Sequence, residues 1–128
     1  MNALVQIKVF NNLLKDFLDY LEDNFPLFSS DITLTRSVLN VLSVTNPRVI
    51  IEQYMNVVSP HKKEIFDCDE QFFLNFNMNG AKISSEKNLI HSLKIRQFWI
   101  DKNTTDKHRA YIWLYFQGFE TRNISTHL

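Results

Sequence analysis

The chain has 128 residues, the usual size of one domain and too short for two domains with separate cores. Its 45% hydrophobic and 13% aromatic residues are enough for a buried core and exclude a chain that is disordered throughout. Fourteen basic and fourteen acidic side chains cancel, which excludes a polyanion-binding charge over the whole molecule. The single cysteine, Cys68, cannot form an internal disulfide and indicates a reducing compartment.

The sequence shows no segment that would carry it into or across a membrane. No stretch approaches 18 uncharged apolar residues, so we expect neither a transmembrane helix nor a membrane partner. Lys8, Lys15 and Asp16 interrupt the apolar residues near the N-terminus, and no small-residue cleavage site follows. We therefore expect an intracellular protein that is not secreted.

The amino-acid composition also carries a bias. Thirteen Asn against two Gly and three Ala is typical of a protein encoded by an AT-rich genome.

The first predicted helix runs from about Ala3 to Asn24. Its apolar residues between Phe10 and Leu21 recur every three or four positions, and charged residues lie largely on the other side. Phe25 precedes Pro26, and a residue before proline resists the α conformation. The helix should therefore stop there.

Capping residues predict the starts of the next helices. Ser29, Ser30 and Asp31 offer caps for a second helix. Asn46-Pro47 should open a third, and Ser59-Pro60 a short fourth that runs through Ile65. The β-branched residues of the third segment make a strand the competing prediction. We favour a helix because its apolar residues follow the 3.6-residue period.

The segment after Asp69 is harder to interpret. A further turn is predicted around residues 69–76, and Asn79-Gly80 is a turn signal. Because strands could flank that dipeptide, a short hairpin is the alternative there. A fifth helix is predicted from Ser84 or Ser85 to about Asp101, followed by a polar loop.

The last predicted helix runs from about Thr105 to Gln117, with Gly118 as its stop. We accordingly divide the chain into a helical domain, residues 1–118, and a loosely ordered C-terminal tail, residues 119–128. The predicted fold is all-α, a single compact bundle of five to six helices. The predicted core residues are Phe17, Leu21, Leu39, Ile50, Tyr54, Phe73, Leu93, Trp99, Ile112 and Tyr115.

Candidate catalytic groups are few. Cys68 with His61 or His91 would be a thiol nucleophile with its base, which requires a stabilised thiolate. Asp67 and Asp69 flank the cysteine, and their negative charge disfavours the thiolate. We therefore predict no catalytic residue, a protein that is not an enzyme, and no small-molecule substrate.

Candidate metal ligands have a simpler interpretation. Asp67, Asp69 and Glu70 could attract a hard cation, but a calcium loop needs a central glycine and a distal glutamate. Negative charge at the start of a short helix explains them better. The four histidines show no zinc spacing with one another or with Cys68. The prediction is therefore no metal and no cofactor.

The charge distribution is uneven. Residues 1–80 hold six Lys/Arg against ten Asp/Glu, and residues 81–128 hold eight against four. A phosphate-contacting surface in the second half would use Trp99 or Trp113 as a stacking platform. An ordinary solvated face is the favoured alternative, because the patch is short and the protein is not basic overall. The candidate nucleic-acid-binding residues are Lys87, Lys94, Arg96, Lys102, Lys107 and Arg109.

Three sequence blocks carry a resemblance. They are Phe17 to Pro26 (FLDYLEDNFP), Asn46 to Leu74 (NPRVIIEQYMNVVSPHKKEIFDCDEQFFL) and Ile112 to Phe119 (IWLYFQGF). Together they resemble a small helical domain of uncharacterised proteins from large nucleocytoplasmic DNA viruses, the relatives of phycodnaviruses and mimiviruses. The resemblance implies a viral protein and agrees with the AT-rich bias. It carries over no catalytic or binding residue.

The functional expectation combines these points. We expect a non-enzymatic structural or protein-interaction module of a large DNA virus, located in the host cytoplasm or nucleus or built into the virion. Its expected partners are proteins, including copies of itself, because an acidic face on one molecule can meet a basic face on the next, head to tail. The alternative is a weak nucleic-acid-binding accessory protein that uses the basic C-terminal half.

Overall fold

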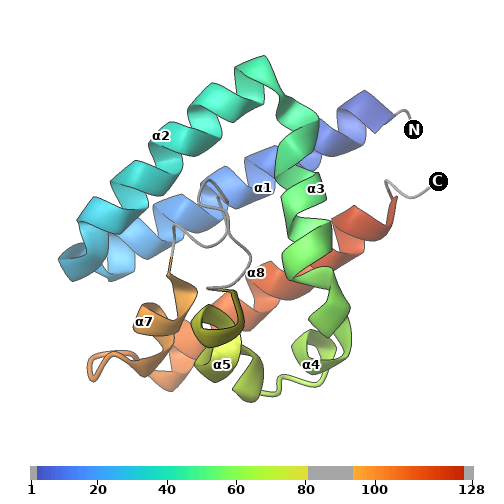
Figure 1. Ribbon diagram of the computed structural model, residues 1–128. Helices are drawn as coiled ribbons and strands as arrows, with labels where there is room; N and C mark the ends of the chain where they lie inside the picture. Colours follow the sequence, from blue (N-terminus) through green and yellow to red (C-terminus); the bar gives the residue numbers. More distant parts are fainter. Residues whose placement is uncertain (1–2, 81–93, 126–128) are drawn as a thin grey trace.

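The computed structural model describes residues 3–80 and 94–125, and within these ranges the chain is helical without a strand (Figure 1). The helices are α1 (Ala3–Asn24), α2 (Ser29–Thr45), α3 (Pro47–Val57), α4 (Lys62–Phe66), α5 (Gln71–Gly80), α7 (Ile95–Ile100) and α8 (Asp106–Ser125). Two 3-10 turns, η1 (Pro26–Phe28) and η2 (Ser59–His61), join α1 to α2 and α3 to α4. The all-α prediction is confirmed. In the described part of the chain, no helix is both long and apolar enough to cross a membrane.

The two longest helices, α1 and α8, form the centre of the bundle. They pack against each other and run in opposite directions, so both described ends of the chain lie on the same side (Figure 1). Helices α2 and α3 pack against α1, and α4 packs against α8. Helix α5 pairs with α7 at the remaining side. Helix α8 is therefore contacted from several directions, which explains why apolar residues occupy more than one of its faces.

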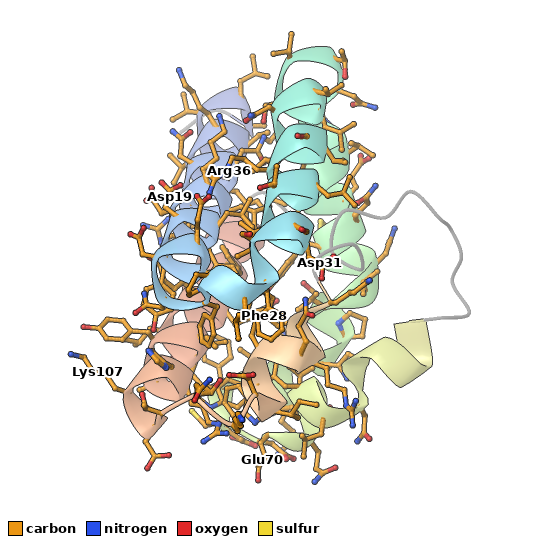
Figure 2. The ribbon with its side chains drawn as sticks, turned by 90° about the vertical axis from the view of Figure 1, so that its left-hand side faces the viewer. Asp19, Phe28, Asp31, Arg36, Glu70 and Lys107 are labelled. Carbon is orange, nitrogen blue, oxygen red and sulfur yellow. The ribbon has the colours of Figure 1, made fainter. Side chains whose placement is uncertain are left out.

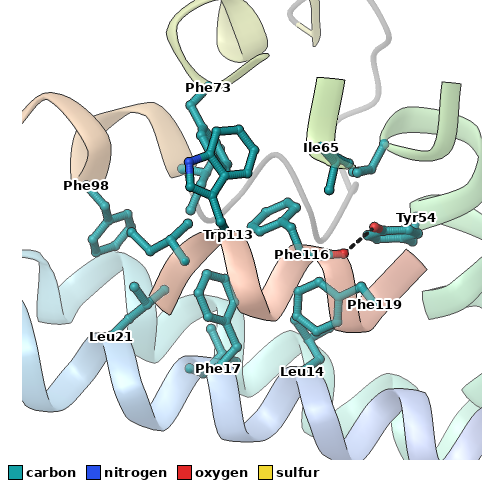
Figure 3. Close-up of a cluster of buried hydrophobic side chains, with 14 of the residues drawn as sticks. Leu14, Phe17, Leu21, Tyr54, Ile65, Phe73, Phe98, Trp113, Phe116 and Phe119 are labelled. Carbon is teal, nitrogen blue, oxygen red and sulfur yellow. Dashed lines mark hydrogen bonds between the residues drawn. The ribbon is translucent and has the colours of Figure 1, made fainter. Parts of the chain in front are cut away.

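An aromatic core fills the space between these helices (Figure 3). The Phe17 ring of α1 lies against the Phe116 and Phe119 rings of α8, with centroids 5.7 Å apart in each pair. The Phe73 ring of α5 stacks on Trp99 of α7 at 4.4 Å. Nine of the predicted core residues lie in described parts of the chain, and eight of them are buried. Tyr115 is only half-buried, and Leu93 lies outside the described residues.

Pro26 and Pro47 predicted helix boundaries correctly, whereas Ser59-Pro60 belongs to the η2 turn and α4 begins only at Lys62. The predicted side-chain caps were wrong. Helix α1 ends at Asn24, and Pro47 occupies the first turn of α3, so the strand alternative for that segment is wrong. No side-chain cap hydrogen bond forms at the start of α2 or from Asn46 at the start of α3. Helix α2 follows η1 directly, which leaves Phe28 at the capping position.

A reciprocal cap does form at the start of α8. The Thr105 hydroxyl accepts the backbone N–H of His108 at 3.1 Å. In return, His108 Nδ1 accepts the backbone N–H of Thr105 at 3.1 Å. This is the geometry of a capping box, with His in the place of the usual Glu or Gln.

The prediction of a turn or hairpin at Asn79-Gly80 is wrong. Helix α5 runs through both residues, and the carbonyl oxygens of Asp69 and Glu70 accept its first backbone hydrogen bonds. The prediction of one unbroken helix up to Asp101 is also wrong. Lys94 adopts a left-handed conformation with φ 55°, so helix α7 begins only at Ile95. The rest of that predicted helix lies outside the described residues.

Gly118 does not stop the last helix. Helix α8 continues to Ser125, and Phe119 and Glu120, which we placed in a loose tail, are buried. A Cβ atom at position 118 would lie 3.3 Å from Leu13 Cδ2 of α1. The absence of a side chain at Gly118 thus allows α1 and α8 to approach closely. Because the following turn of α8 is buried, the helix continues past Gly118. Residues 126–128 lie outside the described part of the chain.

Candidate interaction surface

The outer face of α2 carries no charge. The two charged residues of this helix, Asp31 and Arg36, are half-buried and bind neighbouring helices (Figure 2). Asp31 Oδ2 accepts a hydrogen bond from Gln97 Nε2 of α7 at 2.9 Å. The remaining exposed arc spans about 140° at 100° per residue. Its residues are Thr33, Leu34, Ser37, Asn40, Val41, Val44 and Thr45.

Large apolar side chains are exposed within this arc. Leu34 is 55% exposed, Val41 61% and Val44 83%. A solvent-facing helix surface normally carries charged residues, because they favour water and oppose association. Contiguous exposed apolar side chains without charge mark interaction surfaces. We call this arc the α2 outer face.

A groove of about 400 Å³ adjoins the α2 outer face at the C-terminal end of α2. One wall is a stripe of α1, and the other is the corner where α2 passes into α3. The lining residues are Leu4, Ile7, Lys8, Asn11, Asn12, Lys15, Ser43, Val44 and Pro47. Val44 therefore belongs to both surfaces.

Polar atoms without partners lie in this groove. Asn11 is only 5% exposed, and its Nδ2 donates to the Pro47 carbonyl oxygen at 3.3 Å. Its Oδ1 is buried and accepts no hydrogen bond from the described residues, among which the buried Ser43 Oγ has no partner either. Buried polar atoms are normally paired, so two such atoms in one groove require an explanation.

Three of the candidate nucleic-acid-binding residues make contacts within the protein. The Lys94 Nζ atom lies 3.8 Å from Asp31 Oδ1, and Arg96 Nε donates to the Leu74 carbonyl oxygen at 2.8 Å. Arg109 Nη1 lies 3.6 Å from Asp106 Oδ1, and Nη2 of Arg109 donates to the Trp99 carbonyl oxygen. These three cations therefore serve contacts within the protein.

The other three candidates are Lys87, Lys102 and Lys107. Lys102 and Lys107 are exposed, and Lys107 points away from the molecule (Figure 2). Lys87 lies outside the described residues. Trp99 and Trp113 are buried, so the prediction of an exposed stacking platform is wrong. Trp99 Nε1 donates to Glu70 Oε1 at 3.2 Å, and the Arg109 guanidinium lies 5.5 Å from the Trp99 ring centroid.

Cys68 and its acidic neighbours have structural roles. Cys68 Sγ accepts a hydrogen bond from Gln117 Nε2 at 3.4 Å, whereas His61 Nδ1 pairs with Glu64. Asp69 Oδ1 accepts the backbone N–H of Gln71 at the start of α5, as the helix-start interpretation predicted. In the part of the chain that the structure describes, no cluster of three or more His, Cys, Asp or Glu could hold a metal ion.

Sequence reasoning missed a buried carboxylate. Glu120 of α8 accepts a hydrogen bond from Ser59 Oγ at 3.0 Å. Burial, and then the charge and hydrogen bonding of Glu120, raise the pKa of Tyr54 well above its ordinary value. Nothing in the sequence indicated this polar contact, because Glu120 was assigned to a loose tail and its partners lie about 60 residues away. The side chains of Glu120, Tyr54 and Ser59 join α8 to α3 and η2.

Sequence reasoning also missed the α2 outer face, although a signal was present. The chain has no charged residue between Arg36 and Arg48. Such a run within a predicted surface helix indicates a face that avoids charge. The groove had no comparable signal, because it needs α1 to lie beside the α2–α3 corner.

Comparison with known proteins identifies no relative. No protein-family model matches the chain, and neither a curated protein nor a solved structure matches it at a significant level. The resemblance to a domain of large DNA viruses therefore stays a prediction.

Proposed function

We propose that this protein is a non-enzymatic interaction module whose α2 outer face docks against the same face of a second copy. The observation that carries the proposal is the exposure of Leu34, Val41 and Val44 on a helix face without charge. An uncharged face can meet itself without like-charge repulsion, whereas a face that carries one sign of charge repels its own copy.

The spacing of the apolar residues suits a two-fold contact. Leu34 and Val41 lie seven residues apart, which places them on the same side of α2 two turns from each other. If two copies of α2 cross in opposite directions near Ser37, Leu34 of each copy meets Val41 of the other. The small Ser37 side chain at the crossing point allows the two helices to approach closely.

The expected dimer is weak. Burying a leucine or valine side chain completely stabilises by roughly 1.5–3 kcal/mol, and these side chains are already partly covered. Association itself costs about 4–15 kcal/mol in lost translational and rotational freedom. A contact centred on one helix pair should therefore have a dissociation constant in roughly the micromolar range or weaker.

Sedimentation at rising protein concentration tests the self-docking. The wild type should shift from monomer to dimer, and the double substitution Leu34→Glu and Val41→Glu should keep it monomeric. The matched control is Leu27→Glu with Leu114→Glu, two leucines outside the α2 outer face that are 78% and 61% exposed. A wild type that stays monomeric at high concentration, or a control that dissociates equally, would refute the proposal.

The resemblance to viral proteins suggests where the module works. We propose that the module works inside cells infected by a large DNA virus and is built into the virion, where copies must bind one another. Mass spectrometry of purified particles tests this setting, and absence of the protein from them would contradict it. We do not propose the nucleic-acid alternative, because Lys94, Arg96 and Arg109 are engaged within the protein.

A further inference from the structure

The groove beside α1 combines apolar and cationic walls. Its α1 residues recur at three- and four-residue steps from Leu4 to Lys15, so they form one stripe about 16 Å long. Leu4 and Val44 are largely exposed at its rim, and Ile7 is buried. A stripe of this length matches about five residues of an extended peptide.

The two lysines of the groove have no acidic partner within residues 3–80 and 94–125. None of the nine lining residues is acidic. Among the ion pairs of the described residues, none involves Lys8 or Lys15. The two lysines lie seven positions apart, or about 10 Å along α1, which equals about three residues of an extended chain. The groove therefore favours a ligand with negative charges at that spacing.

The polar floor of the groove selects the kind of ligand. The contact with Pro47 turns the Asn11 amide so that Oδ1 is left as a free acceptor. A peptide N–H can donate to this oxygen, whereas a phosphate oxygen would be repelled by it. The Ser43 hydroxyl, also without a partner, can donate to a peptide carbonyl.

We propose that this groove binds an acidic, partly apolar peptide segment of a partner protein in an extended conformation. Its carboxylates pair with Lys8 and Lys15, its apolar side chains cover Leu4 and Val44, and one backbone N–H donates to Asn11 Oδ1 after a small side-chain rotation. This binding goes beyond the self-docking of the α2 outer face, because the lysines and Asn11 belong to α1. A variant that no longer docks to itself through the α2 outer face should still bind the peptide.

Capped peptides with two Glu three positions apart and Leu between them (Glu-Leu-Leu-Glu), labelled with fluorescein, provide a direct probe. Fluorescence anisotropy up to about 1 mM protein should show binding of this peptide and not of the Gln/Leu or Lys/Leu counterparts. Amide chemical shifts should change within residues 4–15 and 43–47. Absence of binding, equal binding of the three peptides, or shifts confined to other helices would overturn the proposal.

Charge reversal in the groove provides the matched test. The full chain with Lys8→Glu and Lys15→Glu should bind the acidic peptide at least about tenfold more weakly. Lys102→Glu with Lys107→Glu makes the same charge change at exposed lysines outside the groove and should bind like the wild type. If both variants bound the peptide equally weakly, the net charge of the protein would explain the loss of affinity, and the proposal would be overturned. Binding of phosphatidylserine vesicles through Lys8 and Lys15, with no peptide binding, would also overturn it in favour of a membrane surface.

Asn11→Leu separates a binding role from a structural one. Leucine has a similar volume, and the removal of the unpaired acceptor offsets the loss of the 3.3 Å hydrogen bond to Pro47, so the melting temperature should change little. Peptide affinity should nevertheless drop, because a peptide N–H would then be buried without a partner. A variant that is destabilised and still binds like the wild type would show that Asn11 is structural, which contradicts the proposal.

Discussion

Arg36 of α2 lies 2.7 Å from Asp19 of α1, measured from Nη1 to Oδ1, and this contact joins the first two helices (Figure 2). The second arm of the same guanidinium, Nη2, lies 2.7 Å from Glu22 Oε1. Both carboxylates lie in the C-terminal part of α1, where the negative end of the helix dipole disfavours them. Arg36 therefore offsets an unfavourable charge arrangement and aligns α1 with α2.

Arg36→Lys should lower the free energy of unfolding by about 0.5 kcal/mol, because one ammonium cannot bind both carboxylates with the geometry of a guanidinium. The effect is small because the carboxylates are exposed to water. Urea unfolding at low and at high NaCl measures it, and the loss should shrink at high salt. A loss that is independent of salt would mean that packing, not charge, is responsible.

Thr105→Ala should destabilise the protein by about 1 kcal/mol, because it removes the hydroxyl that accepts the N–H of His108 at the start of α8. Thr105→Ser keeps this acceptor and should cost much less. Thermal and urea unfolding of the two variants provide the comparison. Equal destabilisation by both substitutions would show that the threonine methyl group matters and the cap does not.

Cys68→Gly should stabilise the protein by about 0.5–1 kcal/mol. Cys68 has φ 54°, a left-handed conformation that suits glycine, at the C-terminal end of α4. The backbone N–H groups of Cys68 and Asp69 donate to Ile65 and Glu64, as they do in a Schellman motif.

Two further substitutions at position 68 separate backbone strain from the loss of the thiol. Cys68→Ala removes the Gln117 contact and keeps the strain, so it should not stabilise. Cys68→Val should destabilise, because a β-branched side chain tolerates this φ least. Stabilisation by alanine equal to that by glycine would contradict the conformational explanation.

Alkaline pH should weaken the fold partly through Tyr54. Burial raises the pKa of this phenol well above 10.0, and the Glu120 carboxylate adds to the effect. In the unfolded chain Tyr54 loses its proton above about pH 10, whereas the folded protein keeps it. The unfolding free energy is therefore unaffected by this group below about pH 10 and falls as the pH rises above that value.

Tyr54→Phe tests this contribution, because phenylalanine cannot ionise. Its unfolding free energy should fall less than that of the wild type between about pH 8 and pH 11, as measured with urea. Some decrease should persist, since burial also raises the pKa of Tyr20 and Tyr115. An identical decrease in variant and wild type would show that Tyr54 does not contribute.

Much of the helical framework follows from local sequence. Pro26 and Pro47 mark real boundaries, because the fixed φ of proline and its missing N–H act within one helical turn. The 3.6-residue recurrence of apolar residues correctly predicted the burial of Phe17 and Tyr54. These features depend on neighbouring residues alone, and the sequence by itself therefore determined the fold class and the core face of the long helices.

The tertiary structure decided the features on which the proposals rest. Gly118 lies within α8 because Phe119 and Glu120 in the following turn are buried, and Lys94 is paired because Asp31 lies beside it. Asn11 has an unpaired oxygen only because Pro47 holds its amide nitrogen. Each of these contacts joins residues that are distant along the chain. Local propensity acts over a few residues, whereas burial and hydrogen-bond pairing depend on which helices meet.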